Sequence, residues 1–175
     1  MNRLLALLAL AAALLGNGCN PAPPSAEVAA TRRSDPTEPT VAQPRLPTMK
    51  IYVGSEEMVA ELALTPDQQR AGMMFRTNMA ENAGMLFPLF ATQRASFWMK
   101  NCPLPLSAAY IDPEGIVREI HDLEPQNTNS VTATSDTIRF VLETPRGWFQ
   151  RHNIHEGASV ATERGPLLLT FFRPR

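Results

Sequence analysis

Short runs of alternating apolar and polar residues recur along the chain after about residue 50. Such alternation is typical of strands that have one buried and one exposed face. The runs that predict strands are 50–53, 58–64, 97–100, 107–112, 116–123, 137–143, 158–161 and 167–172. Gly54-Ser55 separates the first two runs, and Asp-Pro-Glu-Gly at 112–115 ends one strand and leads into the next. Each of these two pairs of strands is therefore predicted to form a hairpin.

Two short helices are predicted between the strands. The first begins with Thr-Pro-Asp-Gln at 65–68, which has a Thr at the N-cap, a Pro in the first turn and a Gln three residues after the cap. This is a capping box. Gly72 is expected to end the helix after about two turns. The second helix is predicted at 145–152, followed by Asn153 in a left-handed conformation.

The number and order of these elements predict the fold class. About seven or eight short strands and two short helices, without alternating long helices and strands, predict an α+β domain that is mainly antiparallel β. The segment 72–88 carries two glycine-led apolar clusters and is predicted to fold irregularly over the core. We expect a small sheet that is strongly curled or closed like a barrel.

The first 47 residues differ from the rest of the chain. A Leu/Ala run at 4–15 is followed by Gly-Asn-Gly and Cys19, so residues 1–19 are predicted to be a signal peptide. Cys19 resembles the acylated cysteine of bacterial lipoproteins; the alternative is an ordinary signal peptide with an unmodified cysteine. Residues 20–47 are rich in Pro, Ala and Thr and are predicted to be a disordered tether. A single globular domain is then expected at 48–175.

These features predict where the protein acts. We expect an exported protein of the periplasm or outer envelope, held on the membrane by acyl chains on Cys19. The 16 Lys and Arg residues nearly balance the 17 Asp and Glu residues, so no basic surface for nucleic acid is expected. If Cys19 is acylated, Cys102 has no disulfide partner and is expected to pack in the core.

The candidate site lies around the segment 97–106, where aromatic, thioether, cationic and amide side chains are concentrated. Lys100 lies inside an apolar run and must reach water or meet a partner, because burial of an isolated charge is costly. With Arg76, Trp98 and Asn101 it offers two cations, an aromatic plate and an amide. This combination predicts a binding site for a sugar or an anionic small molecule.

Two alternatives to this site remain open. In the first, Trp98 belongs to the core and the two cations pair with Asp112 or Glu143. In the second, two of Asp112, Asp122 and Glu143 act as paired carboxylates in an envelope polysaccharide hydrolase. No metal or other cofactor is predicted, since Met residues beside Leu, Phe and Gly are typical of cores and the three His residues are distant from them in sequence.

The motifs of the domain also resemble those of a known family. They are Gly-Met-Met-Phe-Arg at 72–76, Gly-Met-Leu-Phe at 84–87, Phe-Trp-Met-Lys-Asn at 97–101, Pro-Leu at 105–106, Phe-Val-Leu-Glu at 140–143 and Gly-Trp-Phe at 147–149. In order and spacing they are similar to domain of unknown function 192 (DUF192), over about residues 49–161. The resemblance implies a compact β-rich domain, often exported, without an established activity. Cys102 and Ser107 replace the Thr and Asp that the family usually has, so no catalytic role is expected at Ser107.

Overall fold

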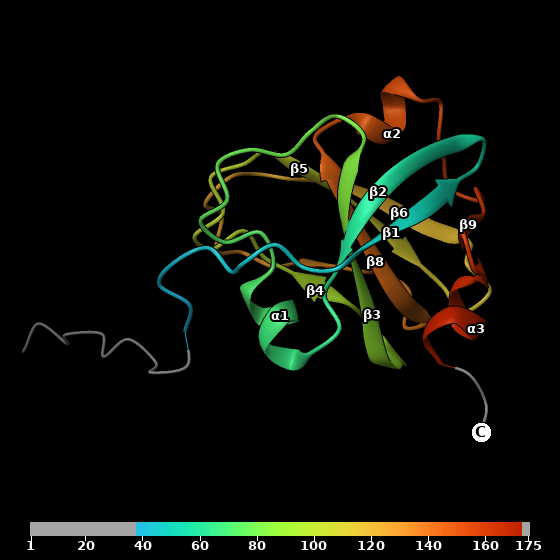
Figure 1. The fold of residues 1–175 in the computed structure, drawn as a ribbon, viewed down its shortest axis with the longest axis horizontal. Helices are drawn as coiled ribbons and strands as arrows, with labels where there is room; N and C mark the ends of the chain where they lie inside the picture. Colours follow the sequence, from blue (N-terminus) through green and yellow to red (C-terminus); the bar gives the residue numbers. More distant parts are fainter. Residues whose placement is uncertain (1–37, 173–175) are drawn as a thin grey trace, which may run out of the picture. The chain divides into compact units, whose positions relative to one another are not determined.

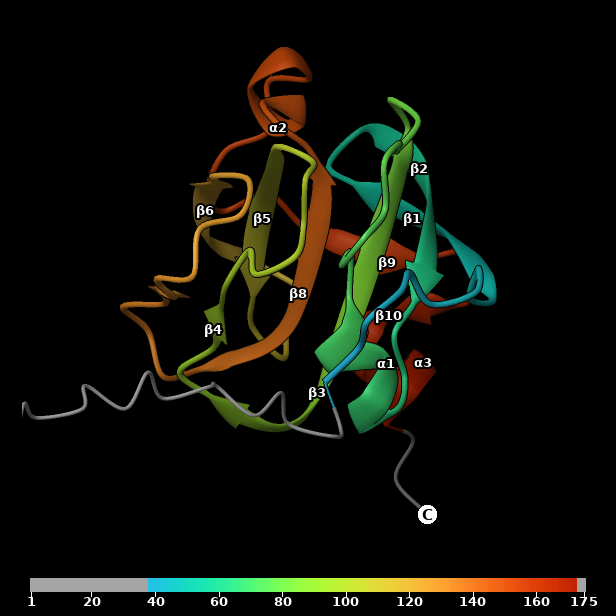
Figure 2. The same ribbon diagram turned by 90° about the vertical axis from the view of Figure 1, so that its left-hand side faces the viewer.

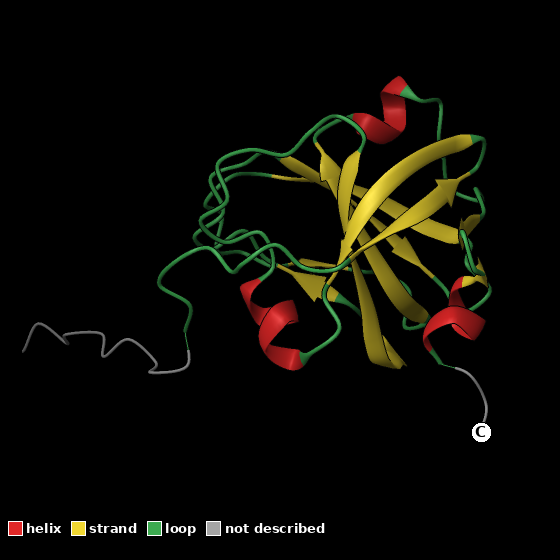
Figure 3. Ribbon diagram, viewed as in Figure 1, coloured by secondary structure: helices red, strands yellow, loops and turns green. Residues whose placement is uncertain are grey.

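The computed structural model describes residues 38–172 of the chain. The predicted signal peptide with Cys19, and the tether up to residue 37, lie outside the described residues. Within the described part, ten strands and three short helices follow one another (Figures 1 and 3). Their bounds are β1 (Thr48–Val53), β2 (Glu56–Leu62), α1 (Pro66–Ala71), β3 (Ala83–Gln93), β4 (Ser96–Phe97), β5 (Leu106–Ile111), β6 (Val117–Leu123), β7 (Val131–Thr132), β8 (Ile138–Pro145), α2 (Trp148–Arg151), β9 (Val160–Thr162), β10 (Gly165–Pro166) and α3 (Leu167–Phe171).

Eight of these strands form one curled sheet in the order β10-β9-β1-β2-β3-β8-β5-β6. Neighbouring strands are antiparallel except β2 and β3, which are parallel. A bridge between Ile116 and Ser159 joins the start of β6 to the start of β9, so the sheet curls back toward itself (Figure 2). Strands β4 and β7 pair separately. The prediction of a mainly antiparallel α+β domain with a curled sheet is confirmed.

Several elements begin and end where short sequence motifs predict. The Thr65 Oγ1 atom accepts a hydrogen bond from the Gln68 backbone N–H at 3.2 Å, and the Gln68 Oε1 atom accepts one from the Thr65 N–H at 3.0 Å. Gly72 ends α1 with a φ of 42°. The β1–β2 and β5–β6 hairpins form, and Asn153 after α2 has a φ of 54°.

Strand β3 is the largest difference from the predicted elements, because the sequence predicts irregular structure up to residue 88. Both faces of its first half are buried, so its residues show no alternation of apolar and polar types. A Cβ atom on Gly84 would lie 3.0 Å from the carbonyl oxygen of Glu143 and 3.1 Å from the Met58 sulfur. Glycine therefore allows β3 to pass close to β8.

Two predicted strands are also wrong. The segment 167–172 forms α3 instead of a strand, since three consecutive Leu residues favour a helix and Leu167 is buried in the core. Of the predicted strand 97–100, only Phe97 lies in a strand, where it forms β4 together with Ser96. Asn101, with a φ of 58°, lies in the turn that follows.

Two apolar cores lie on the two faces of the central strands β3, β8 and β5. Leu86 and Phe140 belong to the first core, inside the curl of the sheet. Their neighbours Phe87 and Val141 point to the opposite face and belong to the second core. The segments that follow α1 and β4 cover this second core, and the candidate site lies among them.

Residues 38–47, here called the strap, contact the folded unit. Gln43 Nε2 donates hydrogen bonds to the carbonyl oxygens of Gln68 at 3.1 Å and Gly72 at 2.9 Å. Leu46 packs against the second core. The Pro-rich composition of residues 38–47 predicts that they belong to the disordered tether. In the structure, residues of this strap already contact the domain that is predicted to begin at residue 48. Side-chain hydrogen bonds to distant residues hold it, and composition does not reveal such partners.

Candidate functional site

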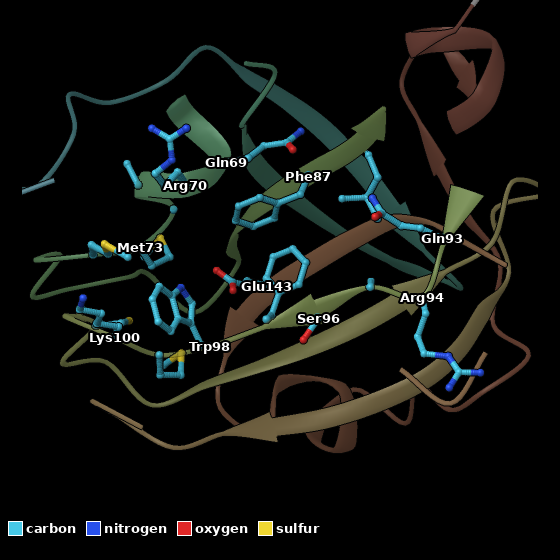
Figure 4. A pocket seen from close by; sticks show the side chains of 18 residues that line it. Gln69, Arg70, Met73, Phe87, Gln93, Arg94, Ser96, Trp98, Lys100 and Glu143 are labelled. Atoms are coloured by element: carbon cyan, nitrogen blue, oxygen red, sulfur yellow. The ribbon is translucent and has the colours of Figure 1, made fainter. Parts of the chain in front are cut away.

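A pocket with a volume of about 380 Å³ opens over the second core. Its lining comes from α1 and the residues after it, from β3 and β4, from the turn after β4, and from Glu143 of β8. Figure 4 shows the carboxyl group of Glu143 between Phe87 and Trp98. We call this cavity the Glu143 pocket.

Glu143 is the most unusual group in the pocket. Strand β8 places it opposite Met85 of β3 and Ala108 of β5, in the interior of the sheet. It is 4% exposed, and its Oε2 atom has no hydrogen-bond partner among the described residues. Burial raises the pKa of Glu143 to about 8, so the carboxyl group is mainly protonated at pH 7. It can then both donate and accept a hydrogen bond.

The walls of the pocket are largely apolar. They are formed by Met73, Met74, Phe87, Leu89, Phe97 and Met99. Cys102 also contributes, and its thiol lies 3.7 Å from the carbonyl oxygen of Leu104. Burial raises the pKa of Cys102 to about 11, so it stays a thiol at neutral pH and is not an activated nucleophile. The pocket is therefore suited to an apolar or aromatic body.

Two of the predicted site residues lie at the rim of the pocket. Trp98 is 45% exposed, and the Lys100 Nζ atom lies 5.3 Å from the centre of its ring. The same Nζ atom lies 2.5 Å from Glu38 Oε1 of the strap. The alternative in which Trp98 is a core residue is thus wrong, and Lys100 pairs with Glu38 instead of Asp112 or Glu143.

The other two predicted residues do not line the pocket. Arg76 Nη1 and Nη2 lie 3.1 and 2.9 Å from the two carboxylate oxygens of Glu61, and the two side chains are only 14% and 15% exposed. Asn101 helps to hold the turn after β4 in place, because its carbonyl oxygen accepts a hydrogen bond from the Phe75 N–H at 2.7 Å. Its amide donates to Glu38 at 3.4 Å. Arg76 is therefore structural, and Asn101 supports the rim.

The three carboxylates considered for hydrolysis lie in different places. Asp112 accepts the Ile116 N–H at 2.8 Å and pairs with Arg118 in the β5–β6 turn. Asp122 accepts the Ser107 hydroxyl at 2.6 Å. Ser107 is next to Ala108, the partner of Glu143, so Asp122 lies on the opposite face of the sheet from Glu143. Glu143 is the only carboxylate among the described residues that line the pocket.

His152 and His155, three residues apart in sequence, are held by contacts with neighbouring side chains. His152 Nδ1 lies 3.0 Å from Glu56 Oε2, and its ring stacks on Trp148. His155 bonds the side chain of Asn153. Across residues 38–172, no group of three or more His, Cys, Asp and Glu side chains is arranged to hold a metal ion.

Sequence patterns alone do not identify Glu143 as the floor of the pocket. The alternation in 137–143 places it on the more polar face of a strand, with Arg139 and Val141. The missing information is that this face is covered by segments from elsewhere in the chain. The signal that could have found it is the single acidic residue that directly follows the apolar run Phe-Val-Leu at 140–142.

Comparisons with known proteins agree with the fold. The family model DUF192, described as "Uncharacterized ACR", matches residues 49–162. A crystal structure of a proposed transcription regulator from Sinorhizobium meliloti 1021 is 27% identical, with a TM-score of 0.66, and the match covers 69% of this chain and 97% of that one. A protein of unknown function from Novosphingobium aromaticivorans DSM 12444 is 29% identical, with a TM-score of 0.62, over 71% of this chain and 94% of that one. No curated protein matches the chain.

Proposed function

The chain belongs to the DUF192 family, and from the site that it carries we propose that it binds a small organic molecule in the Glu143 pocket. One observation carries this proposal: the buried Oε2 atom of Glu143 has no partner among residues 38–172 and belongs to a residue that lines an open cavity. Buried polar groups nearly always have hydrogen-bond partners, because leaving one unpaired costs about 1–3 kcal/mol. A polar group of a ligand would supply the missing partner.

The composition of the pocket supports the same proposal. Ligand sites are typically concave, mainly apolar, about 300–1,000 Å³ in volume, and carry a few polar groups that orient the ligand. The Glu143 pocket combines these properties, with Met and Phe side chains on its walls and a neutral carboxyl group at its floor. Trp98 at the rim offers a flat face on which a sugar or an aromatic ring can stack.

A compound screen with tryptophan fluorescence tests the proposal. The chain has two tryptophans, and Trp148 is fully buried and does not line the pocket, so Trp98 is the reporter. We expect ligands that change the emission also to raise the melting temperature, since a ligand at 100 times its Kd stabilises the folded state by about 2.7 kcal/mol. In the Trp98→Phe control, the fluorescence change should vanish while the thermal shift remains.

Binding should also depend on the floor of the pocket. Glu143→Leu is expected to weaken any such ligand about tenfold or more, because the ligand's polar group loses its partner. Equal affinity of all ligands for wild type and Glu143→Leu would exclude Glu143 from the binding site.

We further propose that the protein is exported and anchored in the cell envelope through Cys19. The Leu/Ala run before Cys19 supports this, and acyl chains would contribute about 0.8 kcal/mol per buried methylene group to membrane binding. Among residues 38–172, no helix has the length and apolarity to cross a bilayer. The near balance of positive and negative charges in this chain gives no support for a role in transcription regulation, the description given to the Sinorhizobium protein.

Cys19→Ala is expected to move the protein from the membrane fraction to the soluble fraction, because the site of acylation is lost. Cell fractionation followed by immunoblotting measures this change. Cys102→Ala removes the other cysteine and serves as the matched control, which should stay with the membranes. Retention of Cys19→Ala on membranes would count against a lipid anchor.

A further inference from the structure

The strap places a carboxylate at the rim of the Glu143 pocket. Glu38 Oε1 lies 2.5 Å from Lys100 Nζ and 3.4 Å from Asn101 Nδ2. The Lys100 and Glu38 side chains are 32% and 24% exposed, so the ion pair is in contact with solvent. Two donors of different chemistry therefore converge on one oxygen atom of an anion beside the opening of the pocket.

The charges around the opening favour an anion. Lys100, Arg70 and Arg94 line the pocket, and the only acidic group among the lining residues, Glu143, is kept mainly neutral by burial. Arg70 pairs with Asp67 at 3.1 Å, whereas Arg94 is exposed and makes no ion pair with any residue in the described part of the chain. A cavity lined by one sign of charge concentrates ligands of the opposite sign.

We propose that Lys100 and Asn101 form an anion subsite of the Glu143 pocket, that Glu38 occupies this subsite when no ligand is bound, and that the ligand is a small organic anion. This inference rests on the proposed ligand-binding function. The carboxylate, or a comparable anionic oxygen group, takes the place of Glu38 at the rim. The apolar body lies along the Met and Phe walls, and a neutral polar group reaches Glu143.

Displacement of Glu38 requires only a local movement. The strap is held by Gln43 and Leu46 further along the chain, so residues 38–42 can move while the rest of the strap stays bound. Ion pairs in contact with solvent are weak, so a ligand anion can compete with Glu38. Glu38 is therefore an internal competitor whose removal should improve the binding of anions alone.

A series of three compounds with the same aromatic body tests the subsite. The anion is 3-(4-hydroxyphenyl)propanoate, its primary amide is neutral, and tyramine is the cation. Affinities are measured by calorimetry with the full chain at low salt. We expect the carboxylate to bind at least fivefold more tightly than the amide and tyramine to bind most weakly, with the advantage of the carboxylate shrinking as salt is added.

Four variants test whether a change in ligand affinity comes from the subsite itself or only from the changed net charge of the protein. Glu38→Gln is expected to bind the carboxylate two- to fivefold more tightly and the amide unchanged. Lys100→Met is expected to bind the carboxylate about tenfold more weakly. Glu57→Gln and Lys50→Met change the net charge by the same amounts at another exposed ion pair, of 2.7 Å, and should change the affinity for the carboxylate less than twofold.

The possible results separate this inference from the proposed function. The anion subsite would be overturned if the carboxylate and the amide bound wild type with equal affinity and Lys100→Met changed neither affinity. The pocket itself would still be a binding site. Weaker carboxylate binding in Glu38→Gln would overturn the competitor role of Glu38. If the carboxylate does not bind but a neutral compound from the screen does, the anion subsite alone fails. If no compound binds, both proposals fail.

Discussion

Glu143 is expected to contribute to the free energy of unfolding of the wild-type chain in a way that depends on pH. This contribution falls by about 3 kcal/mol between pH 5 and pH 7.5. Glu143→Gln should lack this contribution. The expectation follows from the pKa of Glu143, which burial raises from 4.5 to about 8. In the unfolded chain the carboxyl group ionises near pH 4.5, whereas in the folded chain it holds its proton up to about pH 8.

The direction of the effect follows from proton binding. Between these two pKa values the folded state binds more protons than the unfolded state, so folding becomes less favourable as the pH rises. The contribution of Glu143 to the free energy of unfolding is fully present below pH 4.5 and is lost as the pH rises to about 8. Above pH 8 the loss levels off, at about 5 kcal/mol in total.

Urea unfolding of both proteins from pH 4.5 to pH 8.5 measures the difference. The control is Glu119→Gln, in the same sheet. Burial opposes ionisation of Glu119, but hydrogen bonds from Ser135, Thr134 and His121 outweigh it and lower its pKa to about 2. Because the Glu119 carboxyl group stays ionised from pH 4.5 to pH 8.5, Glu119→Gln should not remove the fall in stability with rising pH that is expected from Glu143. Parallel pH curves for wild type and Glu143→Gln would show that Glu143 has an ordinary pKa in the folded protein.

Arg76→Met is expected to destabilise the domain by about 3 kcal/mol, the lower end of the cost of removing one partner from a buried ion pair, because the Arg76 and Glu61 side chains are 14% and 15% exposed. The Glu61 carboxylate would remain charged and largely buried. It would keep its hydrogen bond from the Leu46 N–H, at 2.7 Å, as a partial compensation. The effect is large because both hydrogen bonds between the guanidinium and the carboxylate are lost together.

Chemical unfolding of Arg76→Met and of a matched control tests this expectation. Arg70→Met removes an Arg whose partner, Asp67, is highly exposed, and should cost less than about 1 kcal/mol. If Arg76→Met kept wild-type stability and lost ligand affinity instead, Arg76 would belong to the binding site, as the sequence predicts.

The sequence predictions are accurate where a feature depends on residues close together in the chain, and they fail where it depends on residues far apart. The capping box at Thr65 and the Gly115 turn are set by neighbouring residues, and both form as predicted. Trp98 and Lys100 are likewise close in sequence, and they meet at the rim of one pocket. Local patterns were sufficient for these features.

The features that could not be predicted depend on residues far apart in the chain. Glu61 lies 15 residues from Arg76, and the amide of Asn101 reaches Glu38 across 63 residues. Nothing in the composition around Glu38 marks it as a partner. The burial of Glu143 likewise results from segments that only the folded chain brings over β8.

The contact between β6 and β9 has a consequence for how copies of the protein behave at high concentration. The Val117 N–H donates to Ala158, the Gly157 N–H to Val117, and the Val160 N–H to Gly115. Backbone groups at the open side of an outermost strand are a common starting point for pairing with another molecule. Here some of these groups already bond within the same chain, which leaves fewer of them to start intermolecular β-aggregation where many copies crowd together.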